Sequence, residues 1–84
     1  MDKIEEITSI VEELYQERRI PKNIRAVIEE VLNLLKDSEH SSTVKLSTAV
    51  SMLEEASSDP NIPSHLRTEV WNVISILEAA QADE

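Results

Sequence analysis

The sequence predicts an all-α fold: a four-helix bundle made of two αα-hairpins in tandem. Apolar residues recur at helical spacing in four separate segments. The 84 residues include no glycine, which disfavours the many tight turns of an all-β fold. The segment Ile20–Arg25 returns 42 positions later as Ile62–Arg67, with the pattern Ile-Pro-x-x-apolar-Arg in both copies. Each copy reads as the turn of a hairpin and the start of its second helix.

The first hairpin is expected over about residues 2–37. Its first helix, about 2–17, has acids in the first turn, where the helix dipole favours anions. Ile20-Pro21 ends it, because a residue before proline avoids the α region. Proline can then occupy the first turn of the second helix, about 21–37. The two apolar stripes are Ile4, Ile7, Val11, Leu14 and Ile24, Ile28, Val31, Leu35, the latter widened by Val27 and Leu34.

The second hairpin is expected over about residues 43–81. A polar connector, Asp37–Ser42, precedes it, and Ser41, Ser42 or Thr43 can cap its first helix, about 43–57. The turn residues Ser57–Asn61 separate this helix from the last one, about 63–81. The stripes are Leu46, Ala49, Val50, Leu53 and Leu66, Val70, Val73, Ile74, Leu77.

The two halves align at an offset of 42 without a gap. A single hairpin would leave its apolar side bare, so the two hairpins must pack on each other. We therefore expect one domain over residues 1–84, with the hairpins related by an internal twofold. The identical pairs include Glu12/Glu54, Glu13/Glu55, Pro21/Pro63, Arg25/Arg67, Val31/Val73 and Leu35/Leu77.

The net negative charge of the chain disfavours some classes of binding partner. The formal net charge is −9, and both halves of the chain are acidic. A chain without a domain-wide basic face is poorly suited to nucleic acid, and an anionic membrane would repel it. No apolar run approaches the roughly 20 residues of a spanning helix, and Asp2, Glu5 and Glu6 interrupt any signal-like start. The chain also lacks cysteine. We expect a cytoplasmic protein.

Several motifs resemble those of a known family: Pro21-Lys22-Asn23-Ile24-Arg25, Asp59-Pro60-Asn61-Ile62-Pro63, Arg67-Thr68 and Trp71. It is a small archaeal family, catalogued as uncharacterised protein family 0147, and the resemblance covers about residues 4–78. It implies a compact all-helical domain and assigns no activity, catalytic residue or ligand residue. Ser42–Lys45 departs from the more acidic, proline-containing helix start that the family implies.

Arg25 and Arg67 are the first candidates for a special role. A cation in the first turn of a helix opposes the dipole, so its repetition requires a compensating partner. An antiparallel hairpin places each arginine beside the last turn of the preceding helix. Two kinds of partner are available there: the unpaired end carbonyls and the glutamates Glu12, Glu13, Glu54 and Glu55. The alternative is an anion site, which the surrounding acids disfavour.

Arg18, Arg19, Lys22 and Arg25 gather four cations at the first hairpin tip. This basic tip could dock an acidic partner or an RNA phosphate. The simpler interpretation is neutralisation of the helix dipole and solubility.

Trp71 and Ile76 lie on opposite borders between the core and the surface of the last helix. Trp71 either plugs a groove between helices, covered by Arg67 through a cation–π contact, or anchors a partner or a second copy of the chain. Its equivalent in the first half is Glu29, so the repeat does not demand an aromatic residue there.

No enzyme signature is present, and we expect no catalytic residue, no metal and no cofactor. The two histidines, His40 and His65, have no fixed spacing to carboxylates. The Glu-Glu pairs lack the Glu-x-x-His motif of di-iron bundles. The sequence therefore favours a small non-catalytic module that binds a protein or self-associates. The alternative is an RNA- or nucleotide-linked accessory protein that uses the basic tip.

Overall fold

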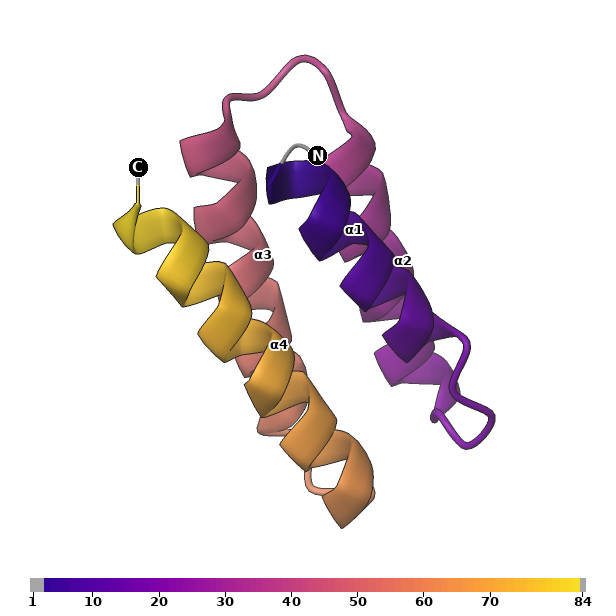
Figure 1. Cartoon of the computed structure of the whole chain (residues 1–84). Helices are drawn as coiled ribbons and strands as arrows, with labels where there is room; N and C mark the ends of the chain where they lie inside the picture. Colours follow the sequence, from indigo (N-terminus) through magenta and orange to yellow (C-terminus); the bar gives the residue numbers. More distant parts are fainter. Residues whose placement is uncertain (1–2, 84) are drawn as a thin grey trace.

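The structure, a computed structural model, describes residues 3–83 and confirms the all-α, four-helix fold (Figure 1). All four helices begin and end within two residues of the predicted bounds. None of the helices in this part of the chain has both the length and the apolar composition to cross a bilayer. The helices are α1 Lys3–Tyr15, α2 Lys22–Lys36, α3 Ser42–Ser57 and α4 Ser64–Ala82.

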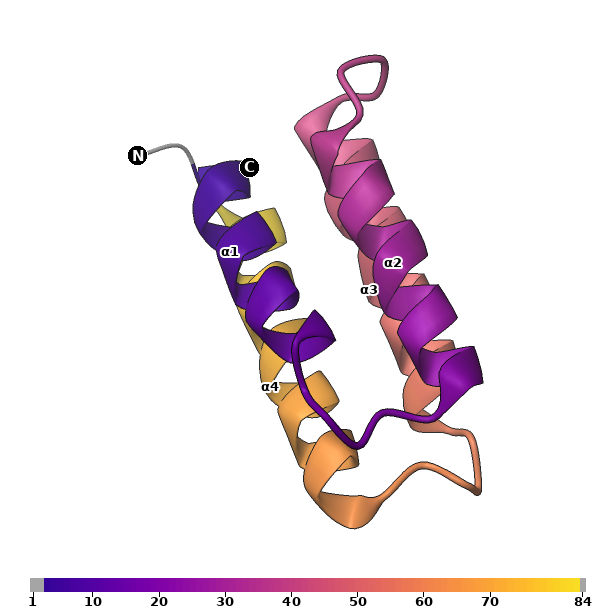
Figure 2. The same ribbon diagram turned by 90° about the vertical axis from the view of Figure 1, so that its right-hand side faces the viewer.

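Consecutive helices run in opposite directions around the bundle. Helix α1 packs against α2 and α4, and α3 packs against the same two helices. Both hairpin tips therefore lie at one end of the bundle, and the connector between the hairpins lies at the other (Figures 1 and 2). The first and last described turns also meet at that second end, where Lys3 Nζ lies 3.2 Å from Asp83 Oδ2.

The core is aliphatic. It is a single cluster of buried side chains from all four helices, and no polar or charged residue among 3–83 is buried. Ile20 and Ile62, which precede the two prolines, join this cluster from the hairpin tips. Burial of the stripes is the main force that holds the helices together. The most completely buried side chains are Val11, Ile24, Ile28, Leu35, Val31, Leu46, Leu53, Leu66, Val70 and Leu77.

The two prolines sit one residue earlier than predicted. Each is the residue just before its helix, with φ/ψ of −55°/146° at Pro21 and −60°/145° at Pro63. Their carbonyls accept the first helical bonds, from Arg25 N at 2.9 Å and from Arg67 N at 3.0 Å. Ser41 caps α3 instead of a proline, because its hydroxyl accepts from Val44 N at 3.3 Å.

Each arginine holds the end of the helix before it. Arg25 donates from its two terminal nitrogens to the carbonyls of Tyr15 and Glu17, both at 3.1 Å. Arg67 donates to the carbonyls of Ser57 and Asp59, also at 3.1 Å. The acceptors are themselves 42 residues apart, so the two forks occupy equivalent positions. Superposition of the two hairpins along their whole length stays a prediction.

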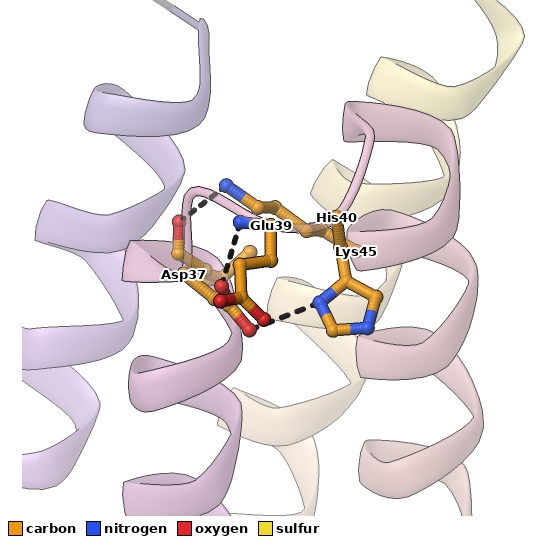
Figure 3. A network of polar contacts seen from close by, with 5 residues as sticks. Asp37, Glu39, His40 and Lys45 are labelled. Carbon is orange, nitrogen blue, oxygen red and sulfur yellow. Dashed lines mark hydrogen bonds and ion pairs between the residues drawn. The ribbon is translucent and has the colours of Figure 1, made fainter.

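A lysine does the same at the connector between the hairpins. Lys45, in the first turn of α3, donates to the carbonyl of Leu35 near the end of α2 at 3.3 Å (Figure 3). Every connector in the described chain is thus held by a cation from the helix that follows it. These cations satisfy end carbonyls and lie where the helix dipole favours positive charge.

The same connector lowers the pKa of Asp37. Its Oδ1 accepts from the backbone N–H of Glu39 at 2.7 Å, and its Oδ2 lies 2.9 Å from Nδ1 of His40 (Figure 3). The bond from Glu39 is the largest cause, and His40 and Lys45 favour the carboxylate further. The pKa of Asp37 therefore lies below its ordinary value of 3.8.

The arginine forks should contribute measurably to stability. Arg67→Ala removes two charge-assisted bonds from a half-buried site and should lower the free energy of unfolding by about 1–3 kcal/mol. Arg67→Lys should recover little of this loss, because lysine has no fork. Urea denaturation measures the effect, with Arg18→Ala at the exposed tip as the control. An unchanged midpoint for Arg67→Ala would show that the fork does not hold the hairpin.

Asp37 should give stability a specific pH dependence. A carboxyl whose folded pKa is lowered stabilises the fold above its unfolded pKa, and this contribution disappears as the pH falls through the folded pKa. Wild type should therefore exceed Asp37→Asn in stability at pH 7, and the difference should vanish at acid pH. Carboxyl ¹³C NMR should place the Asp37 midpoint below 3.8. In His40→Ala the midpoint should rise only in part, because the Glu39 N–H remains. A wild-type midpoint at or above 3.8 would contradict this account.

Candidate functional site

Arg25 and Arg67 bind the end carbonyls and not the glutamates, which were the other partners that the sequence offered. Both guanidinium groups are directed to backbone carbonyls. Glu12 instead forms an exposed ion pair across the first hairpin, with its Oε1 3.2 Å from Lys36 Nζ. Glu13 and Glu55 line two surface grooves described below, and Glu54 is exposed on α3. The arginines therefore serve the hairpin turns and leave these acids on the surface.

One of the four cations of the basic tip, Arg25, is engaged in contacts within the bundle. Arg25 is half-buried and stacks over the Tyr15 ring at 5.2 Å while it donates to the end of α1. Arg18, Arg19 and Lys22 remain exposed. The tip thus offers three accessible cations on a chain of net charge −9.

Trp71 does not plug a groove. Its side chain is 55% exposed, and Ile76 is 39% exposed on the same helix. Arg67 points to the end of α3, and the cation–π contact within residues 3–83 is that of Arg25 with Tyr15. The indole lies just outside the apolar stripe of α4, and the core is complete without it.

The exposed face of α4 carries almost no charge. Glu78 is the one formally charged residue among the exposed positions of Ser64–Ala82. The exposed positions of α1, by contrast, are mostly acids and lysine. We call this surface the α4 face, and its exposed residues between the ends of the helix are Thr68, Trp71, Asn72, Ser75, Ile76, Glu78 and Ala79.

A groove runs beside this face, between α1 and α4, with a volume of about 300 Å³. Helices α1 and α4 are the pair nearest the viewer in Figure 1. Four aliphatic side chains, three carboxylates and one amide line the groove, and one carboxylate oxygen, Oε2 of Glu69, is buried without a hydrogen-bond partner. The lining residues are Ile10, Glu13, Leu14, Glu17, Glu69, Asn72, Val73 and Ile76.

The α2–α3 groove lies on the other side of the bundle, with a volume of about 250 Å³. Six of its eight lining positions are the 42-residue equivalents of positions in the α1–α4 groove. Neither groove is lined by a hydroxyl, lysine or imidazole side chain. No group of three or more His, Asp or Glu among the described residues could hold a metal ion. The lining residues are Asn23, Ile24, Val27, Glu30, Met52, Glu55, Ala56 and Asp59.

Glu69 was missed by the sequence analysis, although the repeat carried a signal for it. Its equivalent is Val27, which widens the apolar stripe of α2 and packs against the core. An acid stands in one half at the position where the other half has an apolar stripe residue. The two halves therefore differ at this point on the edge of the core.

Known proteins are similar in sequence to this chain along most of its length. A relative from Methanothermobacter thermautotrophicus is 41% identical over 73 residues, which cover 87% of this chain and 72% of the relative. A relative from Sulfurisphaera tokodaii is 35% identical over 79 residues, 94% of this chain and 89% of that one.

Two solved structures resemble this one closely. A crystal structure from Thermoplasma acidophilum has a TM-score of 0.84 and 36% identity, and covers 92% of this chain and 91% of that one. A second crystal structure, of a protein of unknown function, has a TM-score of 0.83 and 39% identity, with 92% and 88% covered. The sequence model of the uncharacterised protein family UPF0147 matches residues 1–80. This chain belongs to that family.

Proposed function

We propose that this protein is a non-catalytic interaction module that binds a protein partner through the α4 face. The composition of that face carries the proposal. Trp71 and Ile76 are exposed there, and Glu78 is the one charged residue of the face, although 30% of the chain is charged. The centres of protein interfaces are enriched in aromatic residues and depleted of charge, and tryptophan is a frequent hot spot.

The exposed indole supports this use of α4 in a second way. The core of this bundle is complete without Trp71, so folding does not require an aromatic residue at that position. The same position in the first half is the exposed acid Glu29. An aromatic side chain that the fold does not need is available for contact with another molecule.

A second candidate function rests on the basic tip. Arg18, Arg19 and Lys22 are exposed side chains at one end of the bundle, and they could contact RNA phosphates. The candidate ranks second because Arg25 is engaged in the hairpin turn and no aromatic side chain interleaves the three cations for base stacking.

Trp71→Ala should remove binding and leave the fold intact. Because more than half of the side chain is exposed, the stability change should be about 0.5 kcal/mol or less. The free protein should show red-shifted Trp71 fluorescence, with a blue shift when a partner covers the indole. Affinity capture from the source organism, followed by mass spectrometry and RNA sequencing of the eluate, should identify a stoichiometric protein that Trp71→Ala loses.

Glu29→Ala is the matched control, since it truncates an exposed side chain at the equivalent position of the first half. It should retain the partner. Capture of the same proteins by wild type and Trp71→Ala would contradict the proposal. RNA that is lost at raised salt, and in a variant with Arg18→Glu and Arg19→Glu, would support the second candidate. A blue shift that appears only with increasing protein concentration would make a second copy of the chain the partner.

A further inference from the structure

We infer that the α1–α4 groove receives a lysine or arginine side chain from an amphipathic, basic helix of the partner. The inference rests on the proposed function and adds the chemistry of the partner to it. Asn72 and Ile76 belong both to the α4 face and to the lining of this groove, so one partner can cover the two surfaces together.

The shape and polarity of the groove suit a long cationic side chain. Ile10 and Leu14 of α1 and Val73 and Ile76 of α4 provide apolar contact surface. Lysine and arginine carry an aliphatic stem that packs on such a surface and a charged head that requires acceptors. A volume of about 300 Å³ accommodates one such side chain and leaves room for a neighbouring aliphatic one.

The acceptors are already in place. Glu13, Glu17 and Glu69 line the groove, and none of its lining residues is a cation. Oε2 of Glu69 is out of contact with solvent and has no hydrogen-bond partner. A carboxylate oxygen removed from water without a donor lowers the stability of the fold. When the Glu69 side chain turns toward the groove, an ammonium or guanidinium group would supply the missing donor as a charge-assisted bond.

The equivalent groove between α2 and α3 shows the same scaffold without this requirement. Val27 stands where the first groove has Glu69, and its side chain packs against the core. Asn23 Nδ2 donates to Asp59 Oδ2 at 2.5 Å, so a residue of the chain itself supplies a hydrogen-bond donor to an acid at the rim of that groove. The α1–α4 groove alone therefore keeps a buried acceptor for a group from outside.

Charge selects a basic protein over a second copy of this chain. Two copies would each bring a net charge of −9, whereas a basic helix is attracted by both the groove and the whole molecule. The residues that line the groove span positions 10–17 and 69–76, about two helical turns on each side. A groove of this length suits a helix laid along it with apolar anchors one turn apart.

The test uses the full chain and a defined probe: an amphipathic leucine–lysine peptide of roughly 15 residues, about four helical turns. A matched leucine–glutamine peptide lacks the charge. In ¹H–¹⁵N NMR titrations, the lysine peptide should shift amides of residues 10–17 and 69–76, and the glutamine peptide should bind at least tenfold more weakly. Glu69→Gln should weaken binding of the lysine peptide about tenfold or more, as expected for loss of a charge-assisted bond. Glu30→Gln, in the α2–α3 groove, should leave it unchanged.

Stability provides an independent readout. Glu69→Val copies the residue of the equivalent groove and should raise Tm, by roughly 4–8 °C for a domain of this size. Equal affinity of wild type and Glu69→Gln for the lysine peptide, shifts spread equally over both grooves, or a lower Tm for Glu69→Val would each overturn the inference. The proposed function fails separately: it falls if Trp71→Ala captures the same proteins as wild type, whatever the peptides do.

Discussion

The constraint on which this fold depends is the absence of glycine, because helices commonly end on a glycine with positive φ. No residue among those described has positive φ, so the end carbonyls of the helices must find other donors. Arg25, Lys45 and Arg67 supply them, each from the first turn of the following helix. The cation that should weaken the start of one helix instead completes the end of another.

The sequence predicted the fold well because helical spacing of aliphatic residues decides which faces are buried. Apolar stripes and proline positions located all four helices, and the family resemblance agreed with them. The partners of Arg25 and Arg67 stayed open between carbonyls and glutamates, since spacing places a side chain near a helix end without fixing its acceptor. Trp71 and Glu69 lie at the edge of the core, where one helical wheel cannot tell packing from exposure. Whether a residue at this edge is packed or exposed depends on the arrangement of all four helices.

The two hairpins share the arginine forks at their turns and present different surfaces. Hairpin one exposes acids along α1 and cations at its tip, whereas the α4 face of hairpin two is nearly uncharged and carries the exposed tryptophan. The core positions are aliphatic in both halves, so the differences concentrate where folding does not constrain the residue. Both halves can therefore contribute to the aliphatic core while their exposed surfaces differ.

The closure of the bundle has a consequence for folding order. The cationic clamps join residues only eight to ten positions apart, so each turn closes at a small entropic cost. The contact of α1 with α4, by contrast, joins the two ends of the chain and closes the longest loop. That seam should therefore form last and open most readily. The groove that Glu69 lines lies on this seam, so a helix bound there would join the two hairpins at the contact that forms last.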